Sequence, residues 1–199
     1  YCVANVTEKP ETTAVMNVVS SQYKKPLLEF SGSCAGCAET SYARLITQLF
    51  GDRMYISNAT GCSSIWGGPA ATSPYTVNKD GHGPAWANSL FEDNAEHGYG
   101  MYLGQKAIRN RLIDDVKAIV DSCKAPANVV EAANEYLATL EDGAKNTAAT
   151  EALVAALGDG ACCDNCKSIL ANKDYLAKKS VWIFGGDGWA YDIGFGGVD

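Results

Sequence analysis

Hydrophobic and polar positions along the chain predict short buried strands alternating with amphipathic helices. The apolar runs at residues 54–57 and 181–184 have the length and composition of strands, and a third run at residues 26–30 predicts another. An apolar stripe from Ala43 to Phe50, closed by Gly51, predicts a helix. The order of these elements already favours a protein that mixes strands with helices.

The second half of the chain has a helical pattern. It extends from about residue 87 to residue 124, where apolar residues recur at the spacing of one buried face. The glycines at 98, 100 and 104 predict a bend or break in its first half. Two further stripes predict helices that end at Asp142 and at Gly158. By contrast, residues 60–85 are rich in glycine and proline and predict a long, ordered loop.

The end of the chain sets the fold class. A strand at 181–184, a glycine loop at 185–188 and a predicted helix from Trp189 form a strand–loop–helix unit. Such units build α/β folds with a parallel sheet and flanking helices. Residues 1–25 are polar and irregular, so we expect a linker or an arm there, followed by one domain over residues 26–199.

Composition and charge exclude two classes of partner. The chain has 199 residues, with 16 basic and 23 acidic side chains and a formal net charge of −7. This balance argues against nucleic-acid binding, which requires clustered lysine and arginine. No stretch approaches the roughly 18 apolar residues that cross a bilayer, and no signal peptide is visible. We therefore expect a cytoplasmic protein without a membrane partner.

Eight cysteines are unusual for such a chain. Reduced thiols that serve a metal are favoured over a disulfide framework, because a chain of this size needs no covalent bridges. Cys34 and Cys37 form a CxxC pair around Gly36, which permits the turn that lets two thiolates converge, and Cys62 follows downstream. Spacing alone leaves open a redox dithiol, half of a zinc site, or two buried cysteines. A second pair, Cys163 and Cys166, could complete a zinc site.

Four blocks of sequence, in order along the chain, carry a resemblance to a known family. The blocks are residues 28–40 (LEFSGSCAGCAET), 58–67 (NATGCSSIWG), 83–96 (GPAWANSLFEDNAE) and 182–194 (WIFGGDGWAYDIG). They are similar to the thiamine-diphosphate domain of pyruvate:ferredoxin (flavodoxin) oxidoreductases. The resemblance implies a thiamine-diphosphate-binding fold, of which these residues are an incomplete part.

The resemblance also implies a set of site residues. Cys34, Cys37 and Cys62 match three of the four ligands of a [4Fe–4S] cluster, and Cys62 would lie beside the thiamine. The diphosphate and its Mg²⁺ would be bound by the loop made of Gly186, Asp187, Gly188 and Trp189. The chemistry agrees, because an aspartate offers the hard oxygen that Mg²⁺ prefers and glycines let backbone amides approach phosphate oxygens.

The reaction implied by the family is the oxidative decarboxylation of pyruvate with coenzyme A to acetyl-CoA and CO₂. Electrons would pass through [4Fe–4S] clusters to ferredoxin or flavodoxin, in an enzyme expected to be a homodimer. The resemblance assigns no catalytic side chain within these residues and no role to the acidic stretch at 91–96. The remaining cysteines match no ligand, and we interpret them as ordinary thiols: Cys2, Cys123, Cys162, Cys163 and Cys166.

The chain departs from the family pattern in several places. Ala38 stands where glycine is common, and Ser41 where proline is common. The family's second Mg²⁺ segment, its fourth cluster cysteine and its thiamine-activating glutamate have no counterpart here. We therefore expect a part of a longer enzyme chain that is inactive by itself and binds the cluster incompletely. The alternatives are a binding module with a structural zinc or disulfide site, and a thiamine enzyme for another 2-oxoacid.

Overall fold

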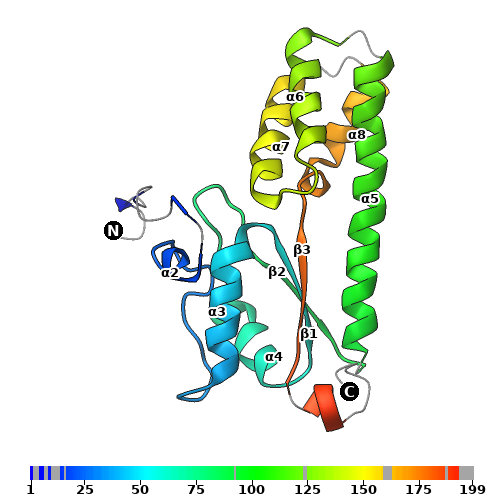
Figure 1. The fold of residues 1–199 in the computed structure, drawn as a ribbon. Coiled ribbons are helices and arrows are strands. Elements are labelled where there is room, and N and C mark those ends of the chain that lie inside the picture. Colours follow the sequence, from blue (N-terminus) through cyan, green and yellow to red (C-terminus); the bar gives the residue numbers. More distant parts are fainter. Residues whose placement is uncertain are drawn as a thin grey trace. The chain divides into compact units, whose positions relative to one another are not determined.

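The chain divides into two compact units. The computed structural model describes residues 1, 5–6, 9, 14–15, 17–91, 93–122, 125–158, 163–186 and 188–192. Unit 1 comprises Tyr1–Tyr99 and Ser180–Asp199, and unit 2 comprises Gly100–Lys179 (Figure 1). Because unit 2 enters between two strands of unit 1, it is an insertion in the connection that joins them.

The sheet of unit 1 contains three parallel strands, which confirms the predicted α/β class. Strand β1 (Met54–Ala59) lies in the centre, between β2 (Ala85–Ser89) and β3 (Ser180–Phe184). Asn58 of β1 pairs in register with Asn88 on one side and Phe184 on the other. All three strands therefore end at the same edge of the sheet (Figure 1).

One face of this sheet is covered by α3 (Ala38–Phe50) and α4 (Cys62–Gly67). Alternate residues of a strand point to the same face, so Met54 and Ile56 both reach this layer. There they join a hydrophobic core made of Leu28, Ala43, Met54, Ile56, Trp66 and Phe184. The helix predicted from the stripe before Gly51 is thus confirmed, and its apolar side faces this core.

The first turns of α5 (Asn94–Ser122) approach the opposite face of the sheet. A Cβ atom on Gly98 would lie 2.5 Å from Cγ1 of Ile183 and 3.3 Å from Cβ of Ser57, so only glycine permits this approach. The predicted break is wrong, because α5 continues through all three glycines. Packing against the sheet explains Gly98, whereas nothing in the structure explains Gly100 or Gly104.

Several other elements differ from the predictions. Residues 26–30 form no strand, and only Leu28 makes an isolated antiparallel bridge, with Tyr75. The predicted loop at 60–85 contains α4 and the short helix η3 (Ala70–Thr72), and β2 occupies the first residues that were predicted to be helical. The helix expected from Trp189 is a π-helical turn, η5 (Gly188–Asp192). A short helix, α2 (Val18–Ser21), lies within the expected arm.

Unit 2 is a helical bundle with its own core. It contains the rest of α5, α6 (Ala127–Ala138), α7 (Gly143–Leu157), α8 (Asp164–Ala171) and η4 (Lys173–Tyr175). The stripe predicted on α5 is confirmed, since Leu112, Val116 and Ile119 are fully buried in this core. Asp142 does not end a helix; its side chain accepts hydrogen bonds from the backbone N–H groups of Ala144 and Lys145 and so begins α7.

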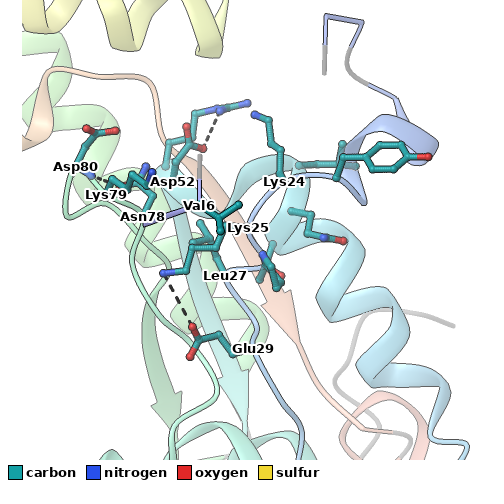
Figure 2. Close-up of a pocket in the computed structure, with 15 residues that line it drawn as sticks. Val6, Lys24, Lys25, Leu27, Glu29, Asp52, Asn78, Lys79 and Asp80 are labelled. Atoms are coloured by element: carbon teal, nitrogen blue, oxygen red, sulfur yellow. Dashed lines mark hydrogen bonds and ion pairs between the residues drawn. The ribbon is translucent and has the colours of Figure 1, made fainter. Parts of the chain in front are cut away.

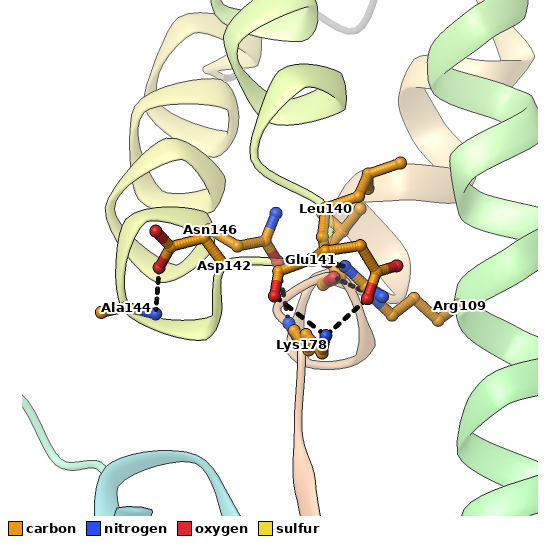
Figure 3. A network of polar contacts seen from close by, with 8 residues as sticks. Arg109, Leu140, Glu141, Asp142, Ala144, Asn146 and Lys178 are labelled. Atoms are coloured by element: carbon orange, nitrogen blue, oxygen red, sulfur yellow. Dashed lines mark hydrogen bonds and ion pairs between the residues drawn. The ribbon is translucent and has the colours of Figure 1, made fainter.

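A polar network fixes the connections between the helices of unit 2 (Figure 3). The Arg109 guanidinium donates to the carbonyl of Leu176 at 2.9 Å, to that of Leu140 at 3.0 Å, and to Oδ1 of Asn146 at 3.2 Å. Asn146 is fully buried, and its Oδ1 also accepts the backbone N–H of Lys178 at 2.8 Å. One arginine thus satisfies carbonyl groups of segments that are distant in sequence. Among the described helices, none is long and apolar enough to cross a membrane.

Candidate functional site

The carboxyl ends of the strands form the candidate site. We call residues 60–62, 90–94 and 185–189 the carboxyl edge; within it, residues 92 and 187 lie outside the described part of the chain. Three of the four family-like blocks each contain the end of one strand and the residues that follow it, after β1, β2 and β3 respectively. In open parallel α/β sheets, ligands bind in the crevice outside the carboxyl ends of the strands. The topology therefore brings the sequence-predicted segments to one edge.

Asn94 joins the three strand ends. It follows β2 and is fully buried, and its Nδ2 donates to the carbonyl of Phe184 at 2.9 Å and to that of Ser57 at 3.3 Å. Its Oδ1 accepts the hydroxyl of Ser57 at 2.6 Å. Because both polar atoms of the amide are used, the side-chain orientation is fixed by its partners.

His97 extends this network by one residue. Its Nδ1 lies 2.6 Å from Oγ of Ser57, which already donates its only proton to Asn94. The Ser57 oxygen can therefore only accept from the histidine, so Nδ1 carries the proton and Nε2 of the neutral ring is the acceptor. The sequence alone gave no signal for this histidine, because its partners are far from it along the chain.

A second group of hydrogen bonds connects the ends of β1 and β2. Nδ2 of Asn88 donates to Oγ1 of Thr60 at 2.9 Å, and Thr60 donates to the carbonyl of Ser89, also at 2.9 Å. The Ser89 hydroxyl donates to a carboxylate oxygen of Asp93. Asp93 is half-buried, and this hydrogen bond connects it to the end of β2. It belongs to the acidic stretch to which the sequence assigned no role.

Asn58 places an unused acceptor at the end of β1. The residue is fully buried, and its Nδ2 donates to the carbonyl of Ala59 at 2.6 Å and to Oγ of Ser63 at 3.0 Å. Its Oδ1 has no hydrogen-bond partner among the described residues. A buried acceptor without a donor is costly, so a ligand or a neighbouring segment with an N–H or O–H group would fit at this position.

The glycine loop after β3 is tight at one residue and open at the next. A Cβ on Gly185 would lie 2.4 Å from Cε3 of Trp189, whereas a Cβ on Gly186 or Gly188 would meet no atom of the described residues within 4 Å. Trp189 is buried, with no partner for its Nε1 in the described part of the chain. Asp187, the predicted Mg²⁺ ligand, lies outside the described residues.

The CxxC pair forms a turn that ends at a helix. The N–H of Cys37 donates to the carbonyl of Cys34 at 3.1 Å, and Gly36 between them has a positive φ of 77°. Cys37 is the half-buried N-cap of α3, and Cys34 is exposed. Cys62 is also exposed, at the first residue of α4. The predicted need for glycine at position 36 is thus explained by the backbone, since other residues rarely adopt this φ.

Two contacts hold the CxxC segment beside the start of α4. The carboxylate of Glu39, in the first turn of α3, accepts a hydrogen bond from Ser63, the residue after Cys62. Gly32 lies against the side chain of Trp66. Burial raises the pKa of Glu39 above its usual 4.5, an effect that the Ser63 hydrogen bond opposes. Burial and the nearby charge of Glu39 also raise the pKa of the Tyr75 phenol.

The positions of the cysteines do not by themselves make a metal centre. In the described ranges, no group of three or more histidine, cysteine, aspartate or glutamate side chains is arranged to hold a metal ion. The structure brings the segments of Cys37 and Cys62 together through Glu39 and Ser63. The cluster-ligand role of the cysteines therefore stays a prediction.

A cavity of about 670 Å³ lies away from the carboxyl edge, beside the start of β1 (Figure 2). Its lining has mixed charge, with the lysines 24, 25 and 79 near Glu29, Asp52 and Asp80. Lys25 forms an ion pair with Glu29 at 4.0 Å and donates to the carbonyl of Val77 at 3.0 Å. None of the sequence-predicted site residues lines this cavity.

The fold and the carboxyl edge define the class of protein first. A parallel sheet with a glycine loop after β3 places the chain among α/β proteins, a class in which ligands commonly bind at the carboxyl ends of the strands. No family model matches the chain. Comparison with curated proteins gives relatives that match most or all of this chain over one segment of their own length.

The chain is 52% identical over 202 residues to pyruvate-flavodoxin oxidoreductase of Klebsiella pneumoniae, covering all of this chain and 17% of that protein. It is 53% identical over 190 residues to pyruvate:ferredoxin oxidoreductase of Moorella thermoacetica, covering 92% of this chain and 16% of the relative. It is 48% identical over 180 residues to the mitochondrial pyruvate dehydrogenase [NADP(+)] of Euglena gracilis, covering 90% of this chain and 10% of that protein. The chain is a homologue of one segment of pyruvate:ferredoxin and pyruvate-flavodoxin oxidoreductases, and spans about a sixth of their length.

Proposed function

We propose that the chain forms part of the thiamine-diphosphate domain of a 2-oxoacid oxidoreductase that converts pyruvate and coenzyme A to acetyl-CoA and CO₂. Residues 26–199 would belong to this domain, and residues 1–25 would be an arm from a preceding region. The observation that carries the proposal is the identity of 52% across the whole chain, in a fold that gathers the family-like blocks at one edge. This combination supports an enzyme part over a zinc or disulfide module.

The carboxyl edge is the proposed cofactor site. Gly186 and Gly188 leave space in which their backbone could approach a diphosphate, and Asp187 and Trp189 belong to the same loop. Asp187 would supply an oxygen ligand to Mg²⁺. When bound, thiamine diphosphate supplies the electron sink for decarboxylation. The buried network around Asn94 would hold the surrounding strand ends rigid, which keeps these groups in a fixed geometry.

The cysteines are the proposed ligands of a [4Fe–4S] cluster beside the cofactor. Cys34 and Cys62 are exposed, and the Glu39–Ser63 contact supports a common location for the two segments. Both segments end at a helix N-terminus, where negative charge such as that of a thiolate cluster is favoured. Cys37 would be the third ligand, and the fourth would come from elsewhere in a longer chain.

The relatives share a substrate in their names but differ in the electron acceptor. The names of the relatives share pyruvate but differ in flavodoxin, ferredoxin and NADP⁺. The chain is similarly identical to all three, at 52%, 53% and 48%, so these identities do not discriminate between the acceptors. We propose ferredoxin or flavodoxin, as in most of the matches, and a homodimeric full enzyme.

A segment exchange tests this proposal. The corresponding segment of the Moorella thermoacetica enzyme, 53% identical, is replaced by this chain, and pyruvate- and CoA-dependent reduction of a viologen dye is measured without oxygen. We expect the chimera to retain dye reduction, whereas the chain alone shows none. A chimera that folds and assembles without activity would contradict the proposal.

Two variants of the chimera separate the sites. Cys62→Ser should lower the iron content and the intensity of the cluster's EPR signal, because one proposed ligand is lost. Gly186→Ala should leave the iron content unchanged and weaken thiamine-diphosphate binding, measured by calorimetry. If Cys62→Ser retains a full cluster signal, Cys62 is no ligand.

A further inference from the structure

The second CxxC pair, Cys163 and Cys166, is joined by geometry rather than by spacing alone. Their sulfur atoms lie 3.3 Å apart at the start of α8 (Asp164–Ala171). Cys163 is the N-cap, in extended conformation with φ −149°, and Cys166 lies in the first turn. Residues three apart on a helix face the same side, so the contact follows from the capping geometry.

The two thiols differ in access. Cys166 is fully buried in the core of unit 2, in the cluster that contains Leu112 and Ile169. Cys163 is half-buried and packs at the margin of the same cluster. A reagent from solvent therefore reaches Cys163 first, and the buried Cys166 sulfur already lies in contact with the Cys163 sulfur.

The charges around the pair favour a thiolate at the outer position. Cys163 lies at the helix N-terminus, whose unpaired N–H groups stabilise negative charge. The adjacent Asp164 carboxylate, which would oppose this, forms an ion pair with Lys167 at 3.2 Å. A half-buried thiol that solvent can reach and a buried second thiol, both at the start of a helix, are the parts that a dithiol needs for exchange with another disulfide.

We propose that Cys163 and Cys166 form a redox-active dithiol that is reversibly oxidised to an intramolecular disulfide by an external low-molecular-weight disulfide. The Cys163 thiolate attacks one sulfur of the external disulfide; a mixed disulfide forms and one thiolate leaves. Cys166 then attacks the Cys163 sulfur and displaces the second thiolate. The external disulfide takes up two electrons and two protons, and the protein loses both from its thiols. This proposal does not depend on the proposed enzyme function.

The geometry needs only a small adjustment. A disulfide bond has a length of about 2.05 Å, so the sulfurs must approach each other from their 3.3 Å separation. The N-cap residue is outside the regular helix, and rotation of its side chain can supply this movement while Cys166 keeps its place in the core.

The test is a redox titration of the full chain. The chain is equilibrated without oxygen in mixtures of reduced and oxidised glutathione, remaining thiols are alkylated, and peptides are mapped by mass spectrometry. We expect a species lighter by two hydrogen atoms, linked between 163 and 166 and fully reversed by dithiothreitol. Exposed Cys62 serves as an internal reference for reagent access. A titration in which both cysteines remain alkylated at every ratio overturns the proposal.

Variants separate the two thiols. Cys166→Val, which keeps an apolar side chain in the core, should accumulate glutathione on Cys163. Cys163→Ser should leave Cys166 modified at least roughly tenfold more slowly, because burial limits access. Cys162→Ser is the matched control from the neighbouring position and should retain the 163–166 disulfide. Loss of the disulfide in that control, or stoichiometric zinc that protects both cysteines from alkylation, overturns the proposal.

Discussion

The side-chain amide of Asn94 donates a 2.9 Å hydrogen bond to the main-chain carbonyl of Phe184, so a residue that follows β2 fixes the end of β3. The two strands are not neighbours, because β1 lies between them. The same amide also engages Ser57 of β1. One buried side chain therefore sets the positions of the loops that follow all three strands.

Replacing this side chain should destabilise unit 1. In Asn94→Ala, the Ser57 hydroxyl and two backbone carbonyls lose a buried partner, and we expect a loss of about 3 kcal/mol in the free energy of unfolding. All four tryptophans lie in unit 1, so their fluorescence during urea unfolding measures this unit. Exposed Lys79, which also lies in unit 1, provides the control, and Lys79→Ala should change the free energy of unfolding by less than about 0.5 kcal/mol. Equal effects of the two substitutions would show that the Asn94 network is not stabilising.

The fold class could be predicted from the sequence because its signals are local. The runs at 54–57 and 181–184 are apolar and short, and glycine follows each strand within a few residues, so a parallel α/β sheet was the natural interpretation. The stripe containing Leu112 and Val116 was equally clear, because a bundle core needs one apolar face.

The remaining elements depend on contacts that the sequence does not display. Strand β2 has no β-branched residue, so the sequence predicted a loop and a helix at this position. Gly98 looked like a helix breaker, but the sheet requires it for close approach. The Asn94–Ser57–His97 network joins residues about forty positions apart, so no local sequence motif predicts it.

The glycine loop after β3 offers a matched pair of substitutions. Gly185→Ala places a methyl group 2.4 Å from the Trp189 ring and should cost about 1–3 kcal/mol of stability. Gly186→Ala meets no atom within 4 Å and should leave stability within about 0.5 kcal/mol of wild type. Urea unfolding followed by tryptophan fluorescence measures both. A destabilised Gly186→Ala with an unaffected Gly185→Ala would contradict this description of the loop.

The tautomer of His97 can be measured directly. Because Ser57 Oγ can only accept from the ring, the neutral imidazole should carry its proton on Nδ1. The chain has two histidines, and exposed His82 gives the solvent reference in two-dimensional ¹H–¹⁵N NMR spectra of the rings. We expect the nitrogen shifts of His97 to differ from those of His82 in the direction of the Nδ1–H form, and Ser57→Ala to remove the difference. Identical nitrogen shifts for the two histidines in the wild-type chain would contradict the hydrogen bond from His97 to Ser57.

Glu39 should make stability depend on pH. Its folded pKa is raised above the ordinary 4.5, chiefly by burial, so its contribution is fully present below pH 4.5, where both states are protonated. As pH rises through the folded pKa, the unfolded chain loses its proton first and that stability is lost. Tyr75 stays neutral here, because its own pKa is raised above 10. Glu39→Gln removes the titration, so the free energy of unfolding of wild type, measured relative to this variant, should fall as pH rises above 4.5 and level off once the folded carboxyl group is ionised. A difference that rises with pH would contradict the raised pKa of Glu39.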